Sequence, residues 1–196
     1  MKFRNLIFTV YLAGAIVMSA GCRGTNITTV QVRQDIDFSF IKKVAVLPLE
    51  NFTAEKSAGD AIRQMVIHEM LASGFVDVSM PGDVMTAIEK TGIRNGHVSN
   101  LNAEQIKAVG SALKVQAVVF GSIERFGDTK SGNYTVPELT VTLMMADANS
   151  GSILWSVTKT SVGDSFLARH FGARSPTMSE IMVQVVRDAI RTLAKQ

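Results

Sequence analysis

The sequence contains a single cysteine, Cys22, so an internal disulfide is excluded and the core must depend on packing alone. It also lacks an uninterrupted apolar run of about 20 residues, the length that a membrane-spanning helix needs. Neither charge dominates, since removing residues 1–21 as a leader leaves 18 basic and 17 acidic side chains among 175 residues. Basic residues form no dense run interleaved with aromatic residues, which argues against nucleic-acid binding.

The motifs of the common catalytic classes are missing as well. The chain has no Gly-x-Ser-x-Gly, no P-loop and no GxGxxG. Its three histidines are far apart in sequence, and His68-Glu69 lacks the second histidine of a zinc-binding helix. We therefore predict a protein that is not an enzyme and that has no catalytic residues, no metal site and no cofactor.

The first 22 residues have the layout of an export signal. Two basic residues in a short head precede residues 6–18, thirteen residues without a charge. The run ends in small residues before Cys22, namely Ser19, Ala20 and Gly21. A basic head, an apolar run of about 7–15 residues and a small-residue exit are typical of a secretory signal, so residues 1–21 are expected to be removed.

Small residues followed by Cys22 also resemble the lipobox of bacterial lipoproteins. The resemblance implies that the Cys22 sulfur receives a diacylglycerol and that the new amino terminus is acylated after cleavage. Ala20 and Gly21 fit the motif, whereas Ser19 stands where Leu is usual. The alternative is an ordinary signal peptidase, which would leave Cys22 as the first residue of an unlipidated protein. In lipoproteins of this kind, an Asp directly after the lipidated cysteine marks retention in the inner membrane. This chain has Arg23 in that position, so the resemblance implies a location on the periplasmic face of the outer membrane.

After the leader we expect two parts, residues 22–40 and residues 41–196. The first carries the lipidated cysteine and a periplasmic tether, because residues 23–37 are polar and span about 50 Å at full stretch. The second is a single domain, with no internal repeat. It starts with the apolar run at residues 44–49, which predicts a strand covered on both faces.

Periodicity and capping signals place the remaining elements. Helices are predicted at residues 57–73, 81–91, 102–113 and 177–194, and strands at 75–79, 115–127 and on both sides of a turn at 149–151. Asn102 with Gln105, and Thr177 with Glu180, are capping-box pairs. The order β-α-β-α-α-β-β-β-α predicts an α/β fold, a single domain with a mixed sheet flanked by helices.

Two details of this assignment can be checked directly against the structure. In the helix at 57–73, apolar residues recur every three or four positions, while Arg63, Gln64 and His68 are expected on the opposite, solvent side. Residues 128–137 are expected to form a polar turn region.

Several segments in this order are similar to the CsgG-like, LpoB-like and PelC-like family of bacterial outer-membrane lipoproteins. They are "VAVLPLENFT", "MLASGF", "VSMPGDV", "LKVQAVVFGSIERFG" and "LMMADANSGSILWSVT". The resemblance implies a CsgG-like periplasmic α/β core hung from the outer membrane, often assembled into rings, with no active site. The two candidate insertions, residues 128–137 and 163–176, are too short for membrane hairpins, because each spanning strand alone takes about 9–11 residues. The resemblance is therefore to the non-channel members.

These features predict a scaffold or accessory factor for envelope assembly or secretion that works through protein contacts. Its expected partners are outer-membrane lipid through Cys22, other envelope proteins and copies of itself. One alternative is an LpoB-like activator of a peptidoglycan synthase, which needs a long tether. Another is a ring-forming subunit of a curli or exopolysaccharide secretion complex.

The candidate contact residues lie mainly in the irregular segment at 164–176. Its aromatic, apolar and basic side chains are typical of interface anchors: Phe166, Leu167, Arg169, His170, Phe171 and Arg174. The alternative is a loop folded back over the core. Trp155, on the apolar face of a predicted strand, is either a core anchor or part of a ring interface.

Overall fold

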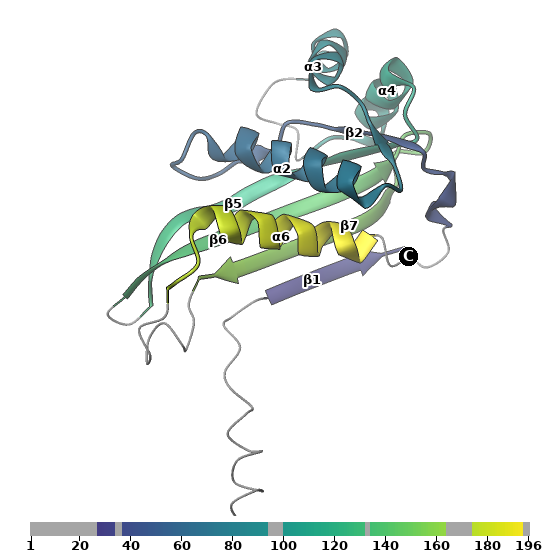
Figure 1. The fold of residues 1–196 in the computed structure, drawn as a ribbon. Coiled ribbons are helices and arrows are strands. Elements are labelled where there is room, and N and C mark those ends of the chain that lie inside the picture. The colour runs from purple at the N-terminus through teal and green to yellow at the C-terminus, as the bar shows by residue number, and fades with distance from the viewer. Residues whose placement is uncertain (1–26, 34–36, 94–99, 132–133, 164–173, 194–196) are drawn as a thin grey trace, which may run out of the picture.

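The computed structural model describes residues 27–33, 37–93, 100–131, 134–163 and 174–193. Within these ranges the chain forms one seven-stranded sheet and four α-helices, none of which is long and apolar enough to cross a membrane (Figure 1). The elements in chain order are β1 (Ile27–Val32), the short 3₁₀ helix η1 (Phe38–Phe40), β2 (Lys43–Val46), β3 (Glu50–Asn51), α2 (Ala58–Ser73), β4 (Asp77–Val78), α3 (Pro81–Lys90), α4 (Ala103–Leu113), β5 (Ala117–Ser131), β6 (Tyr134–Asp147), β7 (Ile153–Val162) and α6 (Met178–Leu193).

The strand order across the sheet is β1-β7-β6-β5-β2-β4, with β3 beside β5. Strands β5, β6, β7 and β1 are antiparallel to one another in turn, whereas β2 is parallel to both β5 and β4. The prediction of an α/β domain with a mixed sheet flanked by helices is therefore confirmed. The predicted order of elements is incomplete, because the structure adds β1 and β3.

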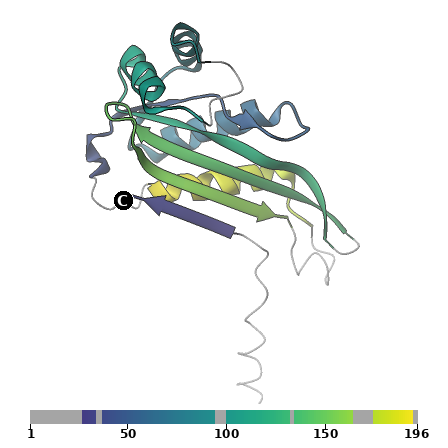
Figure 2. The same ribbon diagram turned by 180° about the vertical axis from the view of Figure 1, so that it is seen from behind.

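Strand β2 is buried on both faces, as its apolar run predicts. Val44 and Val46 point into a large core formed with α2 and α6, while Ala45 and Leu47 point into a smaller core formed with α3 and α4. None of these four side chains is more than 1% exposed. Seen from behind, α3 and α4 lie over one end of the sheet, where Ala146 of β6 joins the smaller core, and no helix of the described residues covers the rest of that face of β6 and β7 (Figure 2).

Both predicted capping boxes are present. At the start of α4, the Gln105 N–H donates to Asn102 Oδ1 at 2.9 Å and the Asn102 N–H donates to Gln105 Oε1 at 3.0 Å. At the start of α6, the Thr177 N–H donates to Glu180 Oε2 at 2.8 Å and the Glu180 N–H donates to Thr177 Oγ1 at 3.3 Å. These bonds satisfy backbone N–H groups that the start of a helix leaves unpaired, and this fixes where each helix begins. Both helices therefore begin where the capping pairs in the sequence predict.

The expectation of a polar turn at residues 128–137 is wrong. Strands β5 and β6 continue through this segment and pair from Asp128 opposite Pro137 to Ser131 opposite Tyr134. We call this paired extension the β5–β6 hairpin. Thr and Val residues along it favour extended backbone, and each strand satisfies the backbone groups of the other although most side chains are polar. Gly, Asp and Pro at its base are turn signals, which the non-local pairing overrides.

Residues 27–32 also differ from the expected tether, because they form strand β1 at the edge of the sheet. The strand pairs with β7 along its whole length, from Ile27 opposite Thr160 to Val32 opposite Trp155. The Lys159 ammonium adds a 2.7 Å hydrogen bond to Thr28 Oγ1. The segment is rich in β-branched residues, which pack well on a pleated surface, and this local signal is consistent with a strand.

Arg63 is a further correction, since it lies inside the fold and not on the solvent side of α2. Only 6% of Arg63 is exposed, and its Nε and Nη2 donate to the carbonyl of Val46 at 3.1 and 2.9 Å. Burial lowers the pKa of the guanidinium, and the nearby charge of Asp60 opposes this effect. Arg63 thus fastens α2 to the carboxyl end of β2.

Candidate functional site

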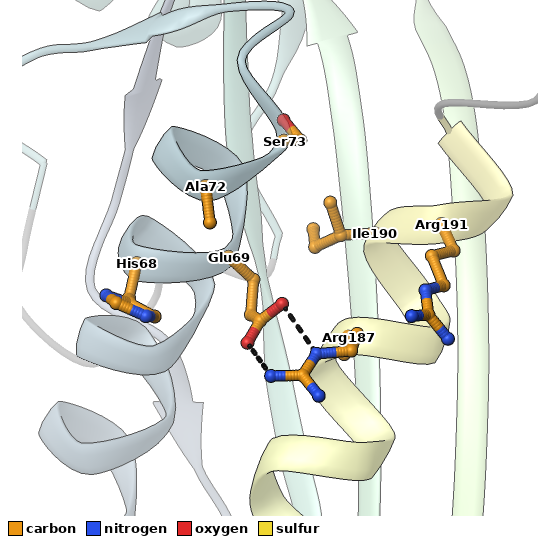
Figure 3. A pocket seen from close by; sticks show the side chains of 7 residues that line it. All are labelled: His68, Glu69, Ala72, Ser73, Arg187, Ile190 and Arg191. Atoms are coloured by element: carbon orange, nitrogen blue, oxygen red, sulfur yellow. Dashed lines mark hydrogen bonds and ion pairs between the residues drawn. The ribbon is translucent and has the colours of Figure 1, made fainter.

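The strongest candidate site is a groove between α2 and α6, on the side of the sheet that these helices cover (Figure 3). We call it the α2–α6 groove. It has a volume of about 310 Å³. The residues lining it include three charged side chains, and the full set is His68, Glu69, Ala72, Ser73, Arg187, Ile190 and Arg191.

An ion pair between Glu69 and Arg187 crosses the floor of the groove. Arg187 Nε donates to Glu69 Oε2 at 3.1 Å, and Arg187 Nη2 donates to Glu69 Oε1 at 3.0 Å. The Glu69 side chain is only 9% exposed, whereas that of Arg187 is 47% exposed. The hydrogen bonds and the charge of Glu69 raise the pKa of Arg187. The guanidinium is therefore held in one orientation, with part of it facing solvent.

The position of Glu69 follows from the pattern of α2. Ile62, Val66 and Glu69 lie on one face of this helix, so the carboxylate replaces an apolar side chain at the edge of the core stripe. A carboxylate in such a position needs a partner, which Arg187 supplies from α6. The sequence alone shows that a glutamate stands within an apolar stripe. It does not show which residue pairs with this glutamate, because the partner is 118 residues away.

The outer rim of the groove is basic. Arg191 lies one turn after Arg187 on α6, and its side chain is 67% exposed. Its Nη1 is 3.9 Å from Asp188 Oδ1, while Asp188 Oδ2 is 3.4 Å from the ammonium of Lys159. Asp188 is shared between Arg191 and Lys159, so Glu69 and Asp188 together face three basic side chains, and the net positive charge favours an anionic group on a partner.

The geometry of the groove suits binding better than acid–base chemistry. The Ser73 hydroxyl donates to the carbonyl of Met70 at 2.5 Å, and the His68 ring points away from the Glu69–Arg187 pair (Figure 3). The groove therefore does not pair a nucleophile with a base. Across the described residues, no group of three or more His, Cys, Asp or Glu side chains is placed to hold a metal ion.

Most of the sequence-predicted site residues lie outside the described ranges, and their roles stay predictions. These residues are Ser19, Ala20, Gly21, Cys22, Phe166, Leu167, Arg169, His170 and Phe171. Arg174 is described and its side chain is 70% exposed. Its Nη2 donates to Glu180 Oε1 at 2.5 Å, so it supports the capped start of α6.

Trp155 is not available for an interface in this fold, which corrects that part of the prediction. The residue is 0% exposed, within the large core. Its indole N–H donates to Thr192 Oγ1 at 3.0 Å, so the polar group of the ring is satisfied internally. Trp155 is the core anchor that the other interpretation of the sequence described.

The start of α6 makes stability depend on pH. Hydrogen bonds from Arg174 and Thr177 hold the pKa of Glu180 at about 2, below its usual 4.5. A carboxylate with a lowered folded-state pKa stabilises the fold above its unfolded pKa, and this contribution is lost as the pH falls towards 2. We expect the Glu180→Gln variant to show a smaller fall in melting temperature than the wild type between about pH 5 and pH 2.

Thermal melts followed by circular dichroism at several pH values test this expectation. Above about pH 5 the two melting temperatures should differ by a constant amount, which serves as the internal control. Parallel curves down to pH 2 would contradict the assignment of Glu180 as a titrating stabiliser.

No protein-family model and no curated protein matches this chain. Its fold does match solved structures. PelC of Paraburkholderia phytofirmans, a dodecamer, has a TM-score of 0.56 at 19% identity, covering 84% of this chain and 96% of PelC. Lipoprotein GNA1162 of Neisseria meningitidis has a TM-score of 0.54 at 13% identity, covering 79% of this chain and 99% of GNA1162. The hypothetical protein CT253 of Chlamydia trachomatis has a TM-score of 0.52 at 14% identity, covering 78% of this chain and 95% of CT253. At such identities the likeness shows a shared fold.

Proposed function

We propose that this protein is a non-enzymatic lipoprotein, anchored through Cys22 to the periplasmic face of the outer membrane, that serves as a scaffold or accessory factor in envelope assembly or secretion. The observation that carries the proposal is the fold shared with PelC and with lipoprotein GNA1162 over most of all three chains. The small residues before Cys22, which resemble a lipobox, support the same conclusion independently.

The mechanism is binding at a membrane surface. Each buried methylene contributes about 0.8 kcal/mol, so several acyl chains on Cys22 form a durable anchor where a single chain holds weakly. Confinement to a surface raises the effective concentration of the domain around its partners, so weak contacts suffice. The α2–α6 groove, with Arg187 fixed by Glu69 and Arg191 at its rim, is the surface that we assign to an acidic group of an envelope protein.

A second candidate function is that of a ring-forming subunit in a secretion or polysaccharide-export complex. The dodecameric state of PelC favours it. The LpoB-like alternative, an activator that reaches through the cell wall to a peptidoglycan synthase, is disfavoured because it needs a long tether. Strand β1 begins only five residues after Cys22, so the chain left for a tether is much shorter than the sequence alone suggests.

The decisive experiment is metabolic labelling with palmitate in the native host. The wild type should incorporate the label and sediment with the envelope, whereas Cys22→Ser should do neither. Ser19→Leu is the matched control, since it brings the motif closer to a lipobox and should keep both properties. If the wild type takes up no palmitate, or if Cys22→Ser remains in the envelope pellet, the proposed function is wrong.

A further inference from the structure

The link between the anchor and the sheet is short. Residues 23–26 separate Cys22 from Ile27, where β1 begins. Five residue steps reach about 18 Å at most, whatever conformation the link takes. Because β1 is paired with β7 from its first residue onward, Ile27 opposite Thr160, the end of the link is fixed to the sheet.

The start of β1 lies at one particular end of the sheet. Since β1 and β7 are antiparallel, Ile27 lies near the carboxyl end of β7. The same end holds the start of α6 and, farther out, the last pair of the β5–β6 hairpin, Ser131 opposite Tyr134, which we call its tip (Figure 1). Following the paired residues across the sheet from Ile27 leads through β7 and β6 to Arg125 in β5. Strand β5 continues for six residues beyond Arg125, to Ser131. Six residues of strand extend about 20 Å.

We propose that the tip of the β5–β6 hairpin rests on the lipid headgroups of the membrane that holds Cys22. The proposal depends on the lipidation of Cys22 put forward above. The reach of the link, about 18 Å, is no longer than the overhang of the hairpin, about 20 Å. The link therefore cannot lift the start of β1 high enough for the hairpin tip to clear the surface while the strands point at the bilayer.

Other orientations keep the hairpin close to the membrane. A domain lying on its β1 edge holds β6, two strands away, about 10 Å farther from the membrane than β1. A domain with the hairpin pointing away would drive the opposite end of the sheet into the bilayer, because β7 extends from Thr160, opposite Ile27, back to Ile153, about 23 Å and more than the link can span. The link therefore keeps the hairpin near the membrane, and the end-on arrangement, in which its tip touches the headgroups, is the one that we propose.

The side chains at this end suit a lipid surface. Tyr134, at the hairpin tip, is 54% exposed, and Ile27 is 57% exposed. A tyrosine ring favours the headgroup level, where its apolar body and its hydroxyl are both accommodated. Lys130, exposed one register position from the tip, can pair with lipid phosphate. At the opposite end of the sheet, Glu104 at the start of α4 has an 83% exposed side chain and pairs with Lys107 at 3.0 Å.

The experiment uses the full-length lipidated protein in vesicles of phosphatidylethanolamine and phosphatidylglycerol. Because acylation blocks the thiol of Cys22, a single introduced cysteine can be labelled with a fluorophore. Thr135→Cys reports on the hairpin and keeps Tyr134 and Lys130 intact, and Glu104→Cys is the control at the opposite end. With a quencher on the lipid headgroups, the label at 135 should lose most of its fluorescence and the label at 104 little.

A second variant tests the cause. Inserting 20 Gly/Ser residues between residues 25 and 26 adds a mean reach of about 25 Å, so the label at 135 should recover its fluorescence. Equal quenching at 135 and 104 overturns the inference. Quenching at 135 that persists after the insertion supports the contact and overturns the short link as its cause. Palmitate labelling of the same samples separates the two proposals: palmitate present with an unquenched 135 overturns this inference alone, and palmitate absent overturns the proposed function.

Discussion

The Gly121→Ala variant is expected to be destabilised by about 3 kcal/mol, which corresponds to a fall in melting temperature of roughly 10 °C for a domain of this size. A Cβ at this position would lie 2.0 Å from the carbonyl oxygen of Thr142 and 3.1 Å from the Cα of Leu143. Both are backbone atoms of β6, the strand paired with β5 here. Since the backbone cannot move away without separating the two strands, the added methyl group cannot be accommodated.

The matched control is Gly82→Ala. Gly82 lies in the first turn of α3 with nothing within 4 Å of an added Cβ, so the change should leave the stability within about 0.5 kcal/mol of the wild type. Urea unfolding of both variants against the wild type gives the comparison. A Gly121→Ala variant as stable as the wild type would show that β5 and β6 do not approach each other as described.

The second large effect is expected for Trp155→Ala, at about 3–5 kcal/mol. The side chain is fully buried between the sheet and α6, so its removal leaves a cavity and frees the Thr192 hydroxyl from its indole partner. Trp155→Phe is the graded control: most of the apolar volume remains and only the N–H donor is lost, so the variant should fall between the wild type and Trp155→Ala.

Unfolding of these variants can be followed by circular dichroism, because the chain has only one tryptophan. In the wild type the emission of Trp155 adds a second probe, since a buried indole should shift to longer wavelength when the protein unfolds. Emission of the folded wild type at the wavelength of free tryptophan would place Trp155 at the surface and contradict its role as core anchor.

What the sequence predicts correctly is what local chemistry determines. The starts of α4 and α6 depend on capping pairs three residues apart, Asn102 with Gln105 and Thr177 with Glu180, and both are where the sequence puts them. Strand β2 is buried on both faces, as its uninterrupted apolar run indicates. In each case the residues that decide the structure are near neighbours in the chain.

The errors concern residues whose surroundings come from distant parts of the chain. Strand β1 and the β5–β6 hairpin look polar in sequence and become strands because they have partners to pair with. Arg63 is buried because the Val46 carbonyl of β2 is within its reach. The α2–α6 groove combines helices 118 residues apart at the Glu69–Arg187 pair, so periodicity within either helix could not reveal it.

The position of β1 also decides when the sheet can be completed during folding. Thr28 in β1 and Lys159 in β7 are 131 residues apart, so their contact closes a loop of most of the chain. Such long-range pairing is slow to form, and it cannot begin before β7 has been synthesised. The amino-terminal strand of the sheet therefore stays unpaired until the chain has been made at least as far as β7, and the antiparallel pairs β5–β6 and β6–β7 can form before it.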